Sequence, residues 1–242
     1  MLEQARAELA PTGVLRAAIN LSNFLLVTGK TPEGDPVGVS PDMARAVADR
    51  LSVGVEYITF ATPGELADAA VEDIWDIGNI GAEPERAKTI AFTAAYAEIE
   101  ATYLVPAGSP IQSIDEVDRE GVRIGVYGRS AYGLWLSGNV EHAELVKTDG
   151  VDASVEVFVE QGLEALAGLR PRLINDVEKL PGARILDGQF TAVQQAIGTK
   201  PDREVAAAFL RDFVEEAKAS GLVAGLIEKH GVVGRLTVAP PA

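Results

Sequence analysis

Segments with strand-like and helix-like character alternate along this chain, and no other feature of the sequence constrains its fold as strongly. Val14–Asn20 and Val55–Phe60 are short β-compatible runs, separated by a segment with helical spacing of its apolar residues. The apolar positions of that segment fall on one helical face: Met43, Ala44, Val47, Ala48 and Leu51. This order of elements predicts an α/β fold, in which crossover helices cover a parallel sheet.

Helix starts can be predicted at several points from capping residues. Ser40-Pro41 predicts a helix with Ser40 as its N-cap and Pro41 in its first turn. The runs Thr62–Glu65 and Ser113–Glu116 each predict a capping box. Val122–Tyr127 reads as a strand that leads through Gly128–Ser130 into another helix, so the βα pattern starts again and predicts a second lobe.

Charge and residue content exclude several classes of function. The 242 residues carry a formal net charge of -15, which repels phosphates, so we expect no nucleic-acid partner. The chain has no cysteine, and its two histidines, His142 and His230, lie far apart in sequence. Thiol chemistry is therefore excluded, and we expect neither a metal site nor a Ser-His-Asp triad nor a bound cofactor.

The first residues, MLEQARAELAPTG, lack the basic and apolar regions of a secretion signal. No later segment is an apolar run long enough to cross a bilayer. We therefore expect a periplasmic location if a signal peptide has been removed, and a cytoplasmic location if Met1 is the native start.

Five segments, in order along the chain, match motifs of one family. Gly38–Asp42 is similar to the opening of that family's first helix, and Glu83–Arg86 (EPER) is similar to its T-P-E-R turn. Phe92–Tyr96, Gly121–Ser130 and Phe213–Gly231 match later motifs of the same family. The chain therefore resembles the periplasmic substrate-binding proteins of ABC importers, in the polar amino-acid group known as family 3.

The resemblance implies a type II clamshell of two α/β lobes joined by two crossing hinge strands. Lobe 1 would comprise residues 1–97 plus 193–242, and lobe 2 residues 98–192. Such a protein closes on a small carboxylate or amino-acid-like ligand without changing it chemically, and the closed form is read by membrane subunits of an ABC transporter. We expect a monomer that is not an enzyme.

Site residues follow from the same resemblance. Arg86, in the P-E-R turn, would hold the ligand carboxylate, because a planar guanidinium can make two parallel hydrogen bonds to it. Backbone amides of Ser130 and Ala131, at a helix N-terminus, would hold the carboxylate from the second lobe. Phe60 would form an aromatic wall. Further positions of the expected site are Asn20, Asn79, Gly81 and Tyr127.

The second lobe departs from the family pattern. Leu169 occupies the position where the family places an acidic partner for the ligand ammonium, and Arg170 follows it. Because a buried ammonium without a carboxylate partner is unfavourable by several kcal/mol, the sequence favours an amine-free acid or a dicarboxylate as ligand. Two alternatives stay open for Arg170: it joins Arg86 in the cleft, or it points to solvent beside Pro171.

Two other functions stay open. A dehydratase of the cyclohexadienyl type shares the fold and needs a general acid with a raised pKa. Its natural position is Leu169, which cannot donate a proton, so Glu98, Glu100 and Asp176 remain as candidate acids. A ligand-sensing module is the third class.

Overall fold

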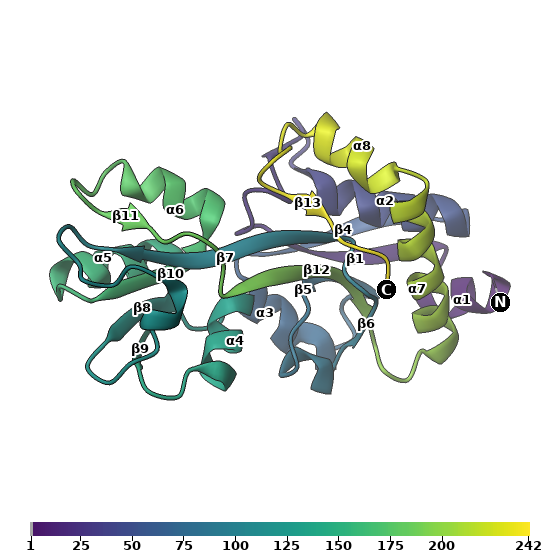
Figure 1. Cartoon of the computed structure of the whole chain (residues 1–242). Coiled ribbons are helices and arrows are strands. Elements are labelled where there is room, and N and C mark those ends of the chain that lie inside the picture. The colour runs from purple at the N-terminus through teal and green to yellow at the C-terminus, as the bar shows by residue number, and fades with distance from the viewer. Residues whose placement is uncertain (1) are drawn as a thin grey trace. The chain divides into compact units, whose positions relative to one another are not determined.

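The computed structural model describes residues 2–242, which divide into two compact units. Unit 1 contains Met1–Glu98 and Gln194–Ala242, and unit 2 contains Ile99–Val193. The chain passes from one unit to the other within two long strands, β7 (Ala97–Val105) and β12 (Thr191–Thr199). Both units consist of helices packed on a sheet, which confirms the α/β class (Figure 1).

The sheet of unit 1 is parallel at its centre. β1 (Val14–Asn20) lies between β4 (Gly54–Phe60) and β5 (Ile77–Gly81), and both neighbours run parallel to it. β12 joins antiparallel on the far side of β5, and β6 (Ala91–Phe92) pairs with β12. Helices cover both faces of the sheet, which explains why β1 has buried residues on both of its faces: Leu15, Ala17, Ala18 and Ile19.

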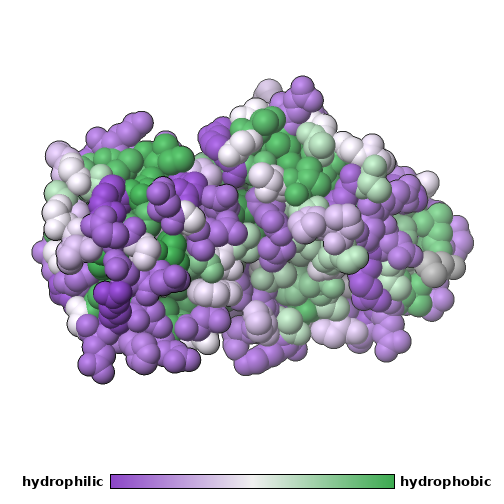
Figure 2. All heavy atoms as spheres, viewed as in Figure 1, coloured by the Kyte–Doolittle hydropathy of each residue, from purple (hydrophilic) through white to green (hydrophobic). Residues whose placement is uncertain are grey.

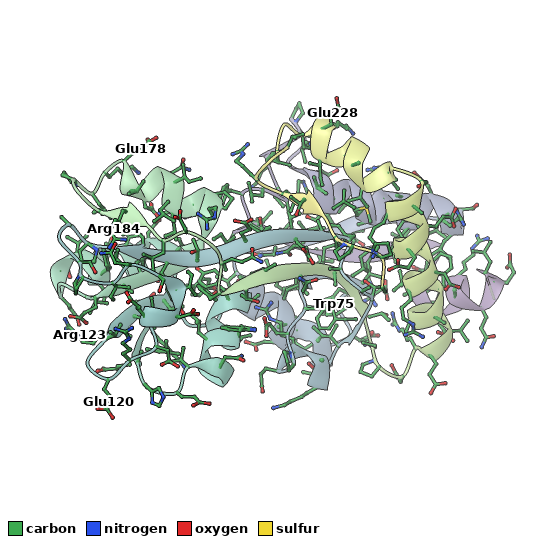
Figure 3. The ribbon with its side chains drawn as sticks, in the orientation of Figure 1. Trp75, Glu120, Arg123, Glu178, Arg184 and Glu228 are labelled. Atoms are coloured by element: carbon green, nitrogen blue, oxygen red, sulfur yellow. The ribbon has the colours of Figure 1, made fainter. Side chains whose placement is uncertain are left out.

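Helices α2 (Val39–Leu51) and α3 (Pro63–Asp68) cover opposite faces of this sheet (Figure 1). On the α3 face, Leu66 packs with Ala18 and Ile80, beside the wholly buried Trp75 (Figure 3). The remaining helices of unit 1 are α1 (Leu2–Leu9), α7 (Glu204–Ala219) and α8 (Leu222–Lys229), and α7 packs against the other two.

The predicted helix starts of unit 1 are only partly right. The capping box at Thr62–Glu65 is confirmed, since Glu65 N donates to Thr62 Oγ1 over 3.2 Å and the Glu65 carboxylate accepts from Thr62 N. The Ser40 cap is wrong: α2 begins at Val39 after Gly38, and Ser40 Oγ instead lies near the Leu26 carbonyl. Gly38 is required there because a Cβ would lie 2.1 Å from Leu26 O.

Three strands of unit 2 run parallel to one another. β8 (Arg123–Tyr127) lies between β9 (Glu144–Thr148) and β10 (Ala165–Leu169), and β7 pairs antiparallel with β10. The short strand β11 (Arg184–Ile185) also pairs with β7. The helices of unit 2 are α4 (Ala131–Asn139), α5 (Val151–Glu160) and α6 (Arg170–Val177).

One local prediction for unit 2 is wrong. The Ser113 side chain makes no capping hydrogen bond, because Glu116 N donates to the Ser113 carbonyl over 3.2 Å, and only a 3₁₀ turn forms at Ile114–Glu116. The run of residues 185–195 is divided between β11 and β12 by a turn at Gly188, whose φ of 80° favours glycine.

Hydrophilic residues are spread over the visible face of both units (Figure 2). No helix within residues 2–242 is long and apolar enough to cross a membrane. Near the C-terminus, β13 (Thr237–Val238) pairs with Glu98 and Ala97 of β7.

Candidate functional site

Three parallel strands of unit 1 end at the same edge of its sheet. Asn20 and Phe60 are partners in register at the ends of β1 and β4, and β5 ends beside them at Gly81. Phe60 is half-buried and packs against the α3-side core, while Asn20 Oδ1 accepts from Ser22 N and Oγ over 3.1 and 2.7 Å. The carboxyl ends of parallel strands are where open α/β sheets bind ligands.

Arg86 lies in the turn that follows β5, in the short 3₁₀ helix η2 (Arg86–Lys88). Its side chain is buried, with 5% of the residue exposed, and Nη1 donates to Gly81 O over 2.7 Å. The strand end therefore anchors the guanidinium at the sheet edge. The structure therefore brings Arg86 and Gly81 together.

The side chain of Asn79 lies elsewhere. Asn79 pairs with Ile19 on β1 and Ile197 on β12, on the sheet face opposite to the one that Ile80 and Ala18 share with α3. It is 1% exposed, and neither its Oδ1 nor its Nδ2 has a hydrogen-bond partner among residues 2–242. Asn79 is therefore a buried, unpaired amide that does not join Asn20 and Phe60.

Glu83 is a residue of this turn that the sequence analysis did not single out. It is half-buried, and burial raises the pKa of its carboxyl to about 7, although the positive charge of Arg86 lowers it. The only sequence signal was its position in the EPER run, where the family motif has threonine.

Unit 2 presents a helix N-terminus at the end of β8. Ser130 is the N-cap of α4, and its Oγ accepts from Gly133 N over 2.9 Å and donates to Tyr127 O over 2.7 Å. The Ser130 amide also donates to Tyr127 O, whereas the Ala131 amide has no acceptor in the described part of the chain. Gly133 permits this packing, since a Cβ would lie 2.2 Å from Tyr127 O.

Arg170 is held by its own unit. Nε donates to Glu100 Oε2 over 2.6 Å, and Nη2 donates to the carbonyl oxygens of Gly188 and Leu186. Leu169, at the end of β10, is half-buried and carries no charge. Arg170 therefore has its hydrogen-bond partners within unit 2, and Leu169 itself supplies no acidic group.

Each of the three candidate proton donors from the sequence analysis has a hydrogen-bond partner. Asp176 is 3% exposed and binds Arg172 Nε through both oxygens at 2.9 Å. Glu100 binds Arg170, and Glu98 Oε1 accepts from Gln194 Nε2 over 2.9 Å. Within residues 2–242, no group of three or more candidate metal ligands is assembled.

The fold and these strand-end groups define the chain as an α/β solute-binding protein. A family model for bacterial extracellular solute-binding proteins, family 3, matches residues 23–233. The chain belongs to this family, which confirms the resemblance to ABC-transporter binding proteins. No curated protein sequence matches it.

Solved structures show the same fold at low sequence identity. A putative ABC-transporter binding component from Wolinella succinogenes, complexed with lysine, has a TM-score of 0.72 and 18% identity, covering 90% of this chain and 95% of its own. The binding protein AbpA from Streptococcus pneumoniae, bound to L-arginine, has a TM-score of 0.70 and 20% identity over 92% and 96%.

An ancestral amino acid-binding protein described as a precursor of cyclohexadienyl dehydratase is also similar. Its TM-score is 0.71 at 19% identity, covering 92% of this chain and 97% of its own. These likenesses establish the type of fold, and the ligand must be argued from this chain's own residues.

Proposed function

We propose that this chain captures a small carboxylate-bearing solute between its two lobes and delivers it to the membrane subunits of an ABC importer. The observation that carries the proposal is Arg86, a buried guanidinium oriented by Gly81 O at the edge where β1, β4 and β5 end. Guanidinium and carboxylate groups match in a planar, bidentate geometry. Asn20 and Phe60 would line the same edge.

Unit 2 would contribute the second half of the site. The amide of Ala131, in the first turn of α4, is a donor without an acceptor among residues 2–242, and the helix N-terminus carries partial positive charge. Tyr127 and Ser130 position that turn through the hydrogen bonds of the α4 cap. A carboxylate bound by both Arg86 and this turn would link the two lobes.

Capture would then proceed by hinge closure. The chain passes between the units in β7 and β12, so small changes of backbone angle in these strands can reorient one unit as a whole. A ligand that touches both units favours the closed form because only that form makes both sets of contacts. A signalling partner in place of an importer would use the same closure.

The proposal includes no chemical step. The dehydratase alternative needs a proton donor, and Glu98, Glu100 and Asp176 are each engaged by a partner within their own unit. Mass spectrometry of the ligand recovered after incubation tests this directly. An unchanged mass supports capture alone, whereas loss of water supports the dehydratase.

We propose that the protein acts outside the cytoplasm, because the family to which the chain belongs is extracellular. We also propose that it acts as a monomer.

The first test is a thermal-shift screen against amino acids, amine-free monocarboxylates, dicarboxylates, and polyols of similar size. A ligand that binds the native state raises the melting temperature, by an amount that grows with its concentration above Kd. Shifts produced by carboxylates and not by polyols support the proposal. Shifts produced by polyols alone contradict it.

A further inference from the structure

The segment Thr237–Ala242 is fastened to the start of β7, one of the two strands in which the chain crosses between the units (Figure 1). Its strand, β13, pairs with Ala97 and Glu98, the two residues of β7 that belong to unit 1. The contact continues past β13, since Ala239 N donates to Tyr96 O over 3.1 Å. Three consecutive residues at the unit-1 end of the crossing strand are therefore bonded to this segment.

The other end of the segment is fastened to α7. Pro240 and Pro241 have no N–H group and a fixed φ, so the segment leaves the sheet as a stiff run. Lys218 Nζ donates to Pro240 O over 2.8 Å, and its side chain is only 5% exposed. Glu215 on the same helix pairs with Lys218 over 2.7 Å and accepts from Ala242 N over 3.3 Å. The segment thus ties β7 to the body of unit 1.

The unit-1 end of β7 is also tied to the second crossing strand. The chain leaves unit 1 after Glu98 and returns to it at Gln194, and Gln194 Nε2 donates to Glu98 Oε1 over 2.9 Å. Gln194 O in turn accepts from Ala82 N over 2.7 Å, beside the Gly81 carbonyl that anchors Arg86. Both crossing strands are therefore held at the point where they enter unit 1.

We propose that Thr237–Ala242 is a strap that fixes the unit-1 end of β7 and thereby strengthens ligand capture, although no residue of the strap belongs to the proposed carboxylate site. The inference rests on the proposed function, because it takes the two lobes to close on a solute. Without the strap, residues 96–98 would lose the hydrogen bonds to it, and the open form would gain backbone freedom at the hinge. Closure would have to remove that freedom, which weakens binding.

The first measurement is the spread of distances between the two units in the ligand-free protein. The chain has no cysteine, so Glu56→Cys in unit 1 and Glu120→Cys in unit 2 allow labelling at two exposed positions only. Nitroxide labels at these positions report the distance distribution by pulsed electron paramagnetic resonance. We expect a chain that ends at Leu236 to give a wider distribution than the full chain, because its hinge has gained freedom.

Lys218→Met is a second variant, which keeps the apolar stem of the side chain and removes the bond to Pro240 O. It should widen the distribution in the same direction, by less than the deletion does. The matched control is Lys200→Met, because Lys200 is a largely buried lysine of unit 1 that pairs with Asp73. K200M should leave the distribution unchanged.

The second measurement is calorimetric titration of the same variants with L-glutamine, succinate and benzoate, which represent an amino acid, a dicarboxylate and an amine-free monocarboxylate. An acid that binds the full chain should bind the shortened chain roughly three- to tenfold more weakly, and K200M should bind it as the full chain does. Chemical denaturation reports that each variant is folded. A segment that only stabilises unit 1 would lower the denaturation midpoint and change neither the distances nor the affinity.

The results separate the strap from the proposed function. A native distance distribution in the shortened chain and in K218M overturns the strap, and so does native affinity in both. If the shortened chain does not fold, K218M decides alone. Binding by none of the three acids contradicts the proposed function, while the distance distributions still decide whether the segment restricts the hinge.

Discussion

Arg170 at the start of α6 donates from Nε to Glu100 Oε2 on β7 over 2.6 Å, and from Nη2 to two carbonyl groups in the segment after β11. The guanidinium therefore connects three parts of unit 2. The Glu100 side chain is 57% exposed, so solvent screens the ion pair. We therefore expect Arg170 to stabilise unit 2 mainly through its hydrogen bonds to the two carbonyl groups.

We expect Arg170→Met to lower the free energy of unfolding by roughly 1 to 3 kcal/mol and to leave ligand affinity within about threefold. Chemical denaturation and calorimetry measure the two quantities. A tenfold loss of affinity with unchanged stability would instead place Arg170 in the binding site, as the sequence analysis allows.

Asp76, at the start of the strand that carries the site, is the most deeply buried charge of unit 1. It is wholly buried, and it binds Arg16 Nη2 over 2.8 Å and Arg203 Nη1 over 2.9 Å. Asp76→Ala leaves two partly buried guanidinium groups without their partner and should cost roughly 3 to 5 kcal/mol.

The matched control is Asp73→Ala. Asp73 contacts the same cations, but its side chain is 73% exposed, and exposed pairs contribute at most about 1 kcal/mol. Denaturant titration of both variants measures the difference. Equal losses would mean that burial of Asp76 does not determine its contribution.

Glu8 on α1 caps the N-terminus of α7. Its Oε2 accepts from Ala206 N over 2.8 Å, while Arg203, the N-cap of α7, makes no side-chain capping bond. Glu8→Ala should destabilise the protein by about 0.5 to 2 kcal/mol, as loss of a cap does. Glu3→Ala, on the exposed side of α1, should have little effect, and similar losses for the two variants would argue against the cap.

Asn79 is a position where an apolar substitution should stabilise the fold. Its amide is buried and has no hydrogen-bond partner in the described part of the chain, so replacing it with an apolar side chain of similar size removes a desolvation penalty. Asn79→Leu should maintain or raise the melting temperature and leave ligand affinity unchanged. Asn79→Asp, which buries an unpaired charge, should lower the melting temperature strongly. Loss of affinity in N79L would show that the amide serves the ligand.

Local patterns in the sequence predicted those parts of the fold that local interactions determine. The helix over Met43 to Leu51, the Thr62–Glu65 capping box and the Ser130 helix start depend on neighbours within a few residues, and the structure contains all three. The Ser113–Glu116 box did not form because the Ser113 carbonyl competes with the Ser113 hydroxyl for Glu116 N. Short motifs cannot reveal such competition.

The site was less accessible to sequence reasoning because its chemistry depends on distant partners. The bond from Arg170 to Glu100 joins residues 70 positions apart, and it changes the interpretation of Arg170. The pKa of Glu83 depends on burial, which the EPER motif does not encode. Arg86 could be predicted because the motif around it matches a known turn, although its anchoring by Gly81 O appears only in the structure.

The central claim is that Arg86 holds the ligand carboxylate, and calorimetric titration of Arg86→Lys with the carboxylate that gives the largest thermal shift tests it most directly. Arg50→Ala is the control, because Arg50 is an exposed arginine of the same unit, paired with Glu216. We predict that R86K, which keeps the charge but loses the bidentate fork, weakens binding roughly tenfold or more, while R50A binds as the native protein does. A correctly folded R86K with native affinity would contradict the claim.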